Sequence, residues 1–249
     1  MLIDTHSHIS NEFYDDIDSV IEENFKYVDK IIISGCEKEA IKESIDIANK
    51  NENIYVTIGY HPDQVDYVND NDIEELKELV KNHKVVGIGE IGLDYYWVKD
   101  NKEKQIELFE KQLELAEELN LPVVIHSRDA TEDTINTLSK YKVNGIIHAF
   151  SGSLETAKKY ISMGYLLGIG GVITFKNSKL YQVIEEIGVD NLVLETDSPY
   201  LTPHPYRGKK NSSKYIPLIC EKISDITGKS NEEVSEITGN NALRLFDLI

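Results

Sequence analysis

Two histidines, His6 and His8, follow a short apolar run at the start of the chain. Alternate side chains of a strand point to the same face, so a spacing of two brings both imidazoles to one side of the strand end. Paired imidazoles are typical ligands of a divalent transition metal. Because an isolated His-x-His also arises often by chance, the pair indicates a metal site only together with further ligands.

Further residues with metal-binding side chains stand at or just beyond the ends of other short apolar runs. All are imidazoles or carboxylates, which suit zinc, manganese, iron or nickel better than magnesium. Without a metal, so many polar groups in one confined site would need water or hydrogen bonds to offset their burial. These residues are Glu90, His126, His148 and Asp197.

A repeated alternation of apolar and charged segments positions these side chains. The apolar runs have the length and composition of buried parallel strands, and the charged stretches place apolar residues three or four apart, as amphipathic helices do. The predicted strands are 1–6, 30–34, 54–60, 85–90, 122–126, 145–149, 165–169 and 192–195. The predicted helices are 37–49, 72–82, 103–120, 131–140, 154–163 and 180–187.

Eight βα units in 249 residues predict an α/β fold of the (β/α)8, or TIM-barrel, class. The alternative, a doubly wound sheet, would want a glycine-rich phosphate loop after its first strand, where this chain has His-Ser-His. The carboxyl ends of barrel strands meet at one rim, so the six candidate ligands are expected to face one cavity. We expect residues 1–249 to form a single domain.

The composition narrows the class of protein. A formal net charge of −18 argues against broad, tight binding of nucleic acid, so any basic groove must be local. The two cysteines, without a Cys-x-x-Cys, predict neither a disulfide framework nor a thiolate zinc site and suit a reducing compartment. With neither a signal peptide nor a membrane span in the sequence, we expect a cytoplasmic protein, and no obligate protein partner is evident.

Six ligands exceed what one catalytic zinc takes from protein, so two divalent ions bridged by a carboxylate are the more economical interpretation. Such a pair activates water and stabilises both oxygens of a displaced ester, which predicts hydrolysis. The sequence leaves the identity of the ions open among Zn, Mn, Mg, Ni and Fe.

Motifs along the whole chain resemble the TatD family of metal-dependent hydrolases, a branch of the amidohydrolase-like barrels. The resemblance implies a deoxyribonuclease, often a 3′→5′ exonuclease, with DNA as substrate. It rests on Ile3-Asp-Thr-His-Ser-His8, Gly59-Tyr-His-Pro62, Gly87-Ile-Gly-Glu-Ile-Gly-Leu-Asp94, Pro122-Val-Val-Ile-His-Ser-Arg128, His148-Ala-Phe-Ser-Gly152 and Leu194-Glu-Thr-Asp-Ser-Pro-Tyr-Leu201.

Carried over by position, the resemblance assigns the ligands to two ions. Glu90 would bridge them, and Asp197 would orient the attacking water and take its proton. The first ion would be held by His6, His8, Glu90 and Asp197, and the second by Glu90, His126 and His148.

Substrate contacts are expected from residues near the same strand ends. Arg128 can hold a phosphate with its planar fork, although a surface salt bridge is an equal alternative. Arg207 and Lys209 lie in Arg207-Gly-Lys-Lys-Asn211, which matches a family loop and can supply a local positive groove. The alternative is a flexible basic loop. His61 can hydrogen-bond the substrate or bind metal.

An aromatic run after the Glu90 strand, Tyr95-Tyr96-Trp97, can stack on a base or pack against the protein core.

The alternative activity is hydrolysis of a carboxylic ester or amide, such as a lactone, a cyclic amide or aminoacyl-tRNA, on the same metal centre. Arg128 and the Arg207–Asn211 loop favour phosphate weakly, since a neutral amide has no need of them. An inactive binding protein is disfavoured, because all six ligand positions carry competent side chains.

Overall fold

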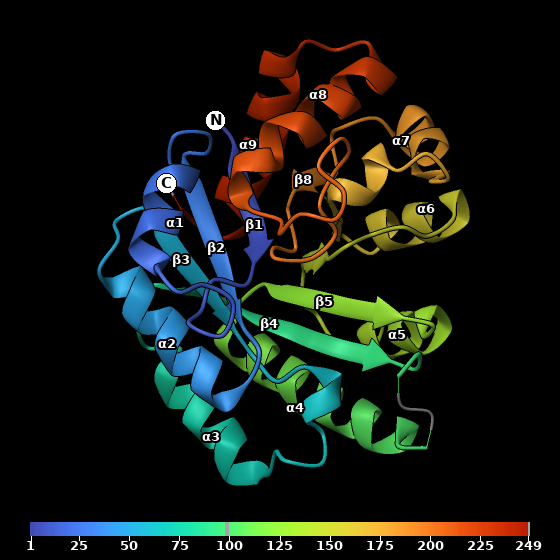
Figure 1. Ribbon diagram of the computed structural model, residues 1–249. Helices are drawn as coiled ribbons and strands as arrows, with labels where there is room; N and C mark the ends of the chain where they lie inside the picture. The colour runs from blue at the N-terminus through green and yellow to red at the C-terminus, as the bar shows by residue number, and fades with distance from the viewer. Residues whose placement is uncertain (98–99, 249) are drawn as a thin grey trace. The chain divides into compact units, whose positions relative to one another are not determined.

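The structure is a computed structural model that describes residues 1–97 and 100–248. Over these residues eight strands alternate with helices along the chain (Figure 1). The strand order of the sheet follows the sequence from β1 to β8, which confirms the predicted (β/α)8 fold class. Contacts divide the chain into two compact units. Unit 1 is Met1–Ile33 with His148–Ile249, and unit 2 is Ser34–Ile147.

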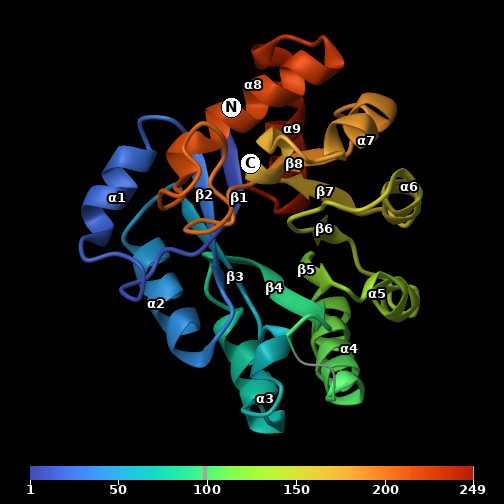
Figure 2. The ribbon, with the colours of Figure 1, turned by 45° about the vertical axis from the view of Figure 1, so that its right-hand side comes forward.

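Unit 1 contains both ends of the chain. Strand β1 pairs in parallel with β2, and β7 with β8. Helix α9 packs against β1 and β8, and α8 packs against α7 and α9 (Figure 2). The elements are β1 (Ile3–Ser7), α1 (Ile17–Asn24), β2 (Lys30–Gly35, which continues into unit 2), α6 (Leu154–Ser162), β7 (Leu166–Ile169), η2 (Gly171–Thr174), α7 (Leu180–Ile187), β8 (Leu192–Leu194), η3 (Ser213–Tyr215), α8 (Ile216–Thr227) and α9 (Asn231–Leu245).

The last helix of unit 1, α9, is fixed at its start and to its strand by side-chain hydrogen bonds. Ser230 and Glu233 form a capping box, in which each side chain accepts the backbone N–H of the other residue. The amide of Asn241 donates to the carbonyls of Asp190 and Leu192, at 2.9 Å each. These bonds attach α9 to the start of β8, the strand that leads to Asp197.

Unit 2 contains strands that pair in parallel in the order β3, β4, β5 and β6. Strands β4 and β5 run side by side in Figure 1, and α4 packs against β4. The elements are α2 (Lys38–Asn49), β3 (Ile54–Ile58), η1 (Pro62–Gln64), α3 (Asp70–Leu79), β4 (Val85–Asp94), α4 (Lys102–Leu119), β5 (Val123–Arg128), α5 (Thr131–Leu138) and β6 (Gly145–Ile147).

Strand β4 is buried along its whole length, as expected of a parallel strand covered on both faces. Gly92 pairs with His126 of β5. A Cβ at position 92 would lie 2.0 Å from the carbonyl oxygen of His126, and φ is +143°, so only glycine fits. The glycine therefore allows β4 and β5 to approach closely where both carry polar side chains.

Several boundaries differ from the sequence predictions. β4 and β5 were expected to end at 90 and 126, but backbone pairing carries them to Asp94 and Arg128. Helix α3 begins at Asp70 and ends at Leu79, against the predicted 72–82. Helices α1, α8 and α9 were not predicted.

Both cysteines are free thiols. Within the described residues, no helix combines the length and the apolar character that crossing a bilayer requires. The prediction of a single domain stays a prediction.

Candidate metal centre

The first group of metal-binding side chains lies in unit 1, at the end of β1 and in the segments that follow β6 and β8. The Nε2 atoms of His6 and His8 are 3.1 Å apart, and Oδ1 of Asp197 lies 3.6 and 3.4 Å from them. The ring of His148 stacks on that of His6, with centroids 3.9 Å apart. Ligand atoms of His6, His148 and Asp197 lie within 4.8 Å of one another. We call these four residues the β1/β8 group.

The chemistry of the β1/β8 group fits a divalent cation. Two imidazole nitrogens that face each other at 3.1 Å can share only one proton, whereas a metal ion accepts a lone pair from each. The carboxylate beside them supplies an oxygen ligand and offsets the positive charge. Imidazole with carboxylate and no sulfur is the donor set of zinc, manganese, iron and nickel sites.

Asp197 is ionised in this setting. Burial alone would raise the pKa of its carboxyl, but the hydrogen bond from His8 and the charges of His148, His6 and His8 outweigh burial and lower the pKa. Its backbone N–H donates to the carbonyl of His6 at 2.9 Å, and its φ of 54° is a left-handed conformation that aspartate tolerates. The backbone thus holds Asp197 beside the β1 histidines.

Two buried acids of unit 1 support the group, and the sequence analysis missed both. Oε1 of Glu195 lies 3.2 Å from Nδ1 of His148 and accepts the N–H of Ala149 at 2.6 Å. A carboxylate on the far nitrogen of a metal-binding histidine fixes its tautomer and orientation. The available signal was spacing, because Glu195 precedes Asp197 by two residues at the end of β8.

The second buried acid, Asp4, ties β1 to the segment after β8. Its carboxylate accepts the N–H and the hydroxyl of Thr196, at 2.9 and 2.6 Å, and the N–H of His6 at 3.3 Å. Burial raises its pKa to about 7 despite these hydrogen bonds. Asp4 therefore positions the backbone of both segments that carry the group.

The second group lies in unit 2, on the carboxyl-terminal halves of β4 and β5 and in the segment that follows β3. Nδ1 of His126 is 2.7 Å from Oε1 of Glu90, and Nε2 of His126 is 3.2 Å from Oδ2 of Asp94. Nε2 of His61 lies 3.8 Å from the same oxygen of Glu90. His61, Glu90 and His126 each offer a ligand atom within 4.8 Å of the others. We call these four residues the β4/β5 group.

The β4/β5 group also fits a divalent cation, with two imidazoles around a buried carboxylate. His61, for which the sequence left metal binding and substrate binding open, lies among the other ligand candidates. Asp94 is a further residue that the sequence analysis missed, although it follows Glu90 by four residues, an even spacing that places both on one face of β4. Burial alone would raise its pKa, but the hydrogen bond and charge of His126 lower it.

Two buried glutamines of α4 fix the strand ends that carry this group. Gln112 accepts the N–H of Tyr60 at 2.6 Å and donates to its carbonyl at 3.0 Å. Gln105 does the same for Asp94, at 2.9 and 3.0 Å. A spacing of seven residues places both glutamines on the same side of the helix. Helix α4 therefore holds in place the backbone next to His61 and that of Asp94.

The cationic residues predicted to contact substrate lie on the surface. Arg128 is exposed, with its guanidinium 4.0 Å from the centroid of the Tyr96 ring. Arg207 donates to the carbonyl of Thr202 at 3.1 Å and lies over the ring of Phe175. Lys209 is exposed, with its Nζ 5.3 Å from the centroid of Tyr206.

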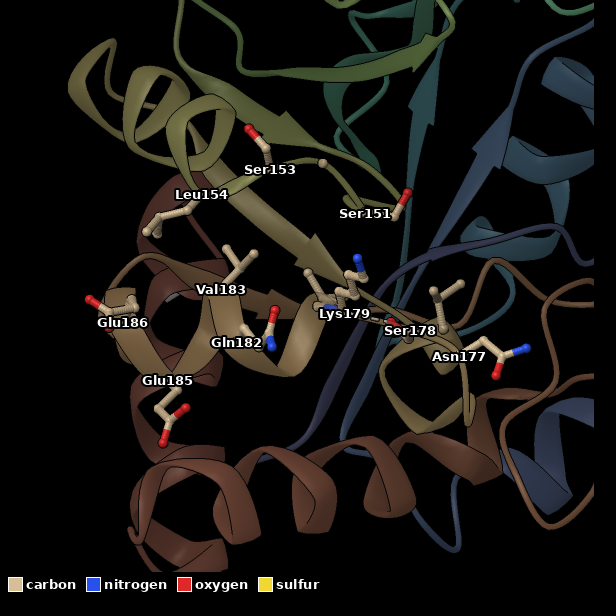
Figure 3. Close-up of a pocket in the computed structure, with 13 residues that line it drawn as sticks. Ser151, Ser153, Leu154, Asn177, Ser178, Lys179, Gln182, Val183, Glu185 and Glu186 are labelled. Carbon is tan, nitrogen blue, oxygen red and sulfur yellow. Dashed lines mark hydrogen bonds between the residues drawn. The ribbon is translucent and has the colours of Figure 1, made fainter.

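A separate hollow of about 780 Å³ opens in unit 1 between the segments that precede α6 and α7 (Figure 3). Ser151 and Ser153 line it from the chain that follows His148, and Lys179 lines it from the start of α7. Glu185 and Glu186 lie along α7, at the far side of the hollow in Figure 3. With two carboxylates against one ammonium among the described residues that line it, the hollow does not favour a phosphate chain.

The structure thus brings the predicted ligands together as two groups, His6, His8, His148 and Asp197 in unit 1 and Glu90 with His126 in unit 2. That all six face one cavity stays a prediction of the sequence.

A (β/α)8 fold places its active site at the carboxyl ends of its strands, and here imidazole and carboxylate groups that could hold a divalent metal lie on or just after the strands. The fold and the site therefore define a barrel protein of the metal-binding class. The family described as TatD related DNase matches residues 3–247, and the chain belongs to this family. It is a metal-dependent hydrolase of the TatD family.

Individual relatives agree with this assignment. The chain is 42% identical to a Bacillus subtilis protein described as the uncharacterized metal-dependent hydrolase YabD, over 99% of both chains. It is 37% identical to the uncharacterized metal-dependent hydrolase MJ1582 of Methanocaldococcus jannaschii, over 98% of this chain and 96% of the relative. The crystal structure of YJJV, a TatD homologue from Escherichia coli, superposes with a TM-score of 0.91 at 29% identity, over 99% of this chain and 98% of that one.

Proposed function

We propose that this protein is a deoxyribonuclease that hydrolyses phosphodiester bonds of single-stranded DNA from an end, in the manner of a 3′→5′ exonuclease. The observation that carries the proposal is the pair of imidazole–carboxylate groups in a chain that belongs to a family described as TatD related DNase. The basic side chains Arg128, Arg207 and Lys209 support a phosphate-bearing substrate in a chain of net charge −18.

We propose that divalent ions bind the β1/β8 and β4/β5 groups, two in number by the family pattern. The ligands we assign are His6, His8, Glu90, His126, His148 and Asp197. Bound divalent ions supply Lewis-acid polarisation of the phosphoryl oxygens and lower the pKa of water. Glu90 would be a ligand of the metal centre in this proposal, and His61 would either complete the β4/β5 group or contact the substrate.

Proton transfer in this proposal falls to Asp197. Its lowered pKa keeps the carboxylate ionised at neutral pH, so an oxygen is available to orient water and accept its proton. Glu195 keeps His148 oriented while this happens, and Asp94 does the same for His126. The guanidinium of Arg128 presents N–H donors in a planar fork that matches two oxygens of a phosphate.

The test is hydrolysis of a single-stranded oligonucleotide labelled at its 3′ or 5′ end, by protein stripped of metal and restored with Mn²⁺, Mg²⁺ or Zn²⁺. We expect stepwise shortening that requires metal and is lost in Glu90→Ala. Glu74→Ala, a change of an exposed glutamate on α3, is the matched control and keeps full activity. The two end labels reveal the direction of shortening.

Absence of cleavage with every ion, in protein shown to bind metal, would overturn the nuclease proposal. A panel of lactones, cyclic amides and aminoacyl-tRNA would then test the alternative hydrolysis of carboxylic esters or amides. An Arg128→Ala variant separates the two chemistries, because only a phosphate substrate needs the guanidinium. We expect this variant to bind metal normally and to cleave DNA at least tenfold more slowly.

A further inference from the structure

The aromatic run that follows β4 divides into one buried and two exposed rings. Tyr95 is buried, and its hydroxyl donates to Asp133 at 2.9 Å. Tyr96 is 49% exposed and Trp97 is 71% exposed. Packing therefore explains Tyr95 but not its two neighbours. Trp97 is the only tryptophan of the chain. A single exposed ring is common on protein surfaces, but here two exposed rings lie in contact with each other and form one patch.

The two exposed rings are held in a fixed arrangement. Oδ1 of Asp94 accepts the backbone N–H of Tyr96 at 2.9 Å and that of Trp97 at 3.3 Å. The two rings meet edge to face, with centroids 4.8 Å apart and planes at 88°. A ligand that stacks here does not have to order the turn first, which lowers the entropic cost of binding.

A cation completes the cluster. Arg128 ends β5 directly beside Asp94 of β4, and its guanidinium lies 4.0 Å from the Tyr96 centroid and 5.5 Å from that of Trp97. No ion pair with an acid accompanies it among the described residues, so the surface salt bridge considered as an alternative is not formed there. A guanidinium stacked on a ring keeps its in-plane N–H donors available for an anion. The cluster thus offers exposed rings next to an available cation.

The cluster is connected to the β4/β5 group by a single side chain. While Oδ1 of Asp94 fixes the aromatic turn, Oδ2 of the same carboxylate lies 3.2 Å from Nε2 of His126. His126 in turn contacts Glu90 at 2.7 Å. A molecule bound on the rings therefore lies next to residues that we assign to metal.

We propose that Tyr96, Trp97 and Arg128 form a nucleotide subsite, in which one base of single-stranded DNA stacks on Trp97 and the adjoining phosphate binds Arg128. This inference rests on the proposed function and adds the residues that would bind one nucleotide of its single-stranded substrate. Every base has a π face, so such a subsite accepts any sequence, whereas the bases of a duplex are already stacked on one another.

Because Trp97 is the sole tryptophan, its fluorescence reports this subsite alone, without turnover. Metal-stripped, full-length protein is titrated with single-stranded oligothymidylate and, in parallel, with a strand of the same length that lacks its bases. We expect saturable quenching by the first strand, with the base-free strand binding about tenfold more weakly and leaving the fluorescence unchanged. A duplex of the same length should also leave it unchanged.

The affinity of protein variants for a labelled single strand of DNA tests the same subsite. Trp97→Leu should lose about tenfold in affinity, and Trp97→Phe should recover most of the loss because it restores a ring. Tyr67→Leu is the matched control, since Tyr67 is another exposed aromatic ring of unit 2, outside the cluster. It should bind as the wild type does.

The outcomes separate this subsite from the proposed function. If the wild type shortens DNA but Trp97 fluorescence does not respond and Trp97→Leu binds normally, the subsite is wrong and the nuclease stands. If bases quench Trp97 but no strand is cleaved with any metal, the subsite stands and the nuclease is wrong. If neither occurs, both are wrong.

Discussion

At the scale of single residues, carboxylates hold the imidazoles of both groups. Glu195 contacts His148, Asp94 contacts His126, and Asp197 lies 3.4 Å from His8. Such contacts set which ring nitrogen carries a proton and which is left to bind metal. The candidate metal centre therefore depends on Glu195 and Asp94, two acids that are not among the predicted ligands, as well as on Asp197.

Replacement of Glu195 tests this dependence. Glu195→Gln keeps the shape of the side chain but removes its charge from Nδ1 of His148. We expect metal affinity or catalytic activity to fall by roughly 10–100-fold, the usual effect of losing such a partner. Metal content by elemental analysis, together with activity across a metal titration, measures the loss.

The matched control is Glu185→Gln, because Glu185 is an exposed glutamate of α7. It should bind metal as the wild type does. Equal metal affinity in both variants would show that Glu195 does not orient His148.

At the scale of elements, helix α4 positions the β4/β5 group through its buried glutamines. Gln112 satisfies both backbone groups of Tyr60, and Gln105 satisfies those of Asp94. Backbone groups at strand ends have no ladder partner, and buried ones must be paired. The helix supplies those partners next to His61 and at Asp94, where the chain leaves the regular sheet.

Gln112→Leu should therefore destabilise the fold. The leucine leaves the N–H and the carbonyl of Tyr60 buried without their partner, at a cost of about 2–4 kcal/mol in the free energy of unfolding. Denaturant unfolding measures this, with Gln182→Leu, a change of an exposed glutamine on α7, as the control. A loss below about 0.5 kcal/mol would contradict the positioning role.

The start of helix α3 gives a pH-dependent prediction. The carboxylate of Asp72 accepts the N–H of Asn69 at 2.8 Å and pairs with Lys38 at 2.8 Å. Burial alone would raise its pKa, but Lys38 and the Asn69 N–H lower it. A folded-state pKa below the unfolded value of about 3.9 stabilises the fold above that pH, and the contribution is lost as pH falls through the folded pKa.

Asp72→Asn should therefore lower the free energy of unfolding by roughly 0.5–1 kcal/mol at neutral pH, because the substitution removes a negative charge from the first turn of the helix. The difference from the wild type should begin to shrink as pH falls below about 4 and should vanish once pH lies below the folded pKa of Asp72. Unfolding curves at several pH values measure it, beside Glu74→Gln, which alters an exposed charge of the same helix. A difference that is independent of pH would contradict the assignment.

At the scale of the whole molecule, the net charge of the chain and metal binding both affect the stability of the folded state. A net charge of −18 disfavours the compact state through self-repulsion, and acids gathered around histidines add to it. A divalent cation held by these groups would offset part of this repulsion and would bind the folded chain in preference to the unfolded one. Metal should therefore stabilise the protein as well as activate it.

Thermal unfolding tests this point. At a free metal concentration of about 100 times Kd, binding adds about 2.7 kcal/mol, which for a chain of this size raises Tm by about 5–10 °C. A chelator should reverse the shift, and Asp197→Asn should reduce it. Equal Tm values with and without chelator would show that the two groups do not hold metal in the folded state.

The strands were predictable because each is a short apolar run, buried on both faces. The end of β4 was not predictable, because the continuation Ile-Gly-Leu-Asp94 carries a glycine that weakens strand propensity and stays extended through pairing with β5. The same pairing extends β5 to Arg128. Helix α9 was missed, although Ser230 and Glu233 are a readable capping box.

The sequence by itself determined the fold class and the identity of the candidate ligands. Periodicity and residue type are local properties, so they can be read from the sequence without knowing the tertiary contacts. Only the tertiary structure decided which acid contacts which histidine. It also decided that Gln105 and Gln112 hydrogen-bond the backbone of Asp94 and Tyr60. The exposure of Trp97 and the burial of Tyr95 likewise follow from it. These features depend on side chains that lie far apart along the chain, or on which side of a turn faces the core. Sequence spacing alone cannot specify either.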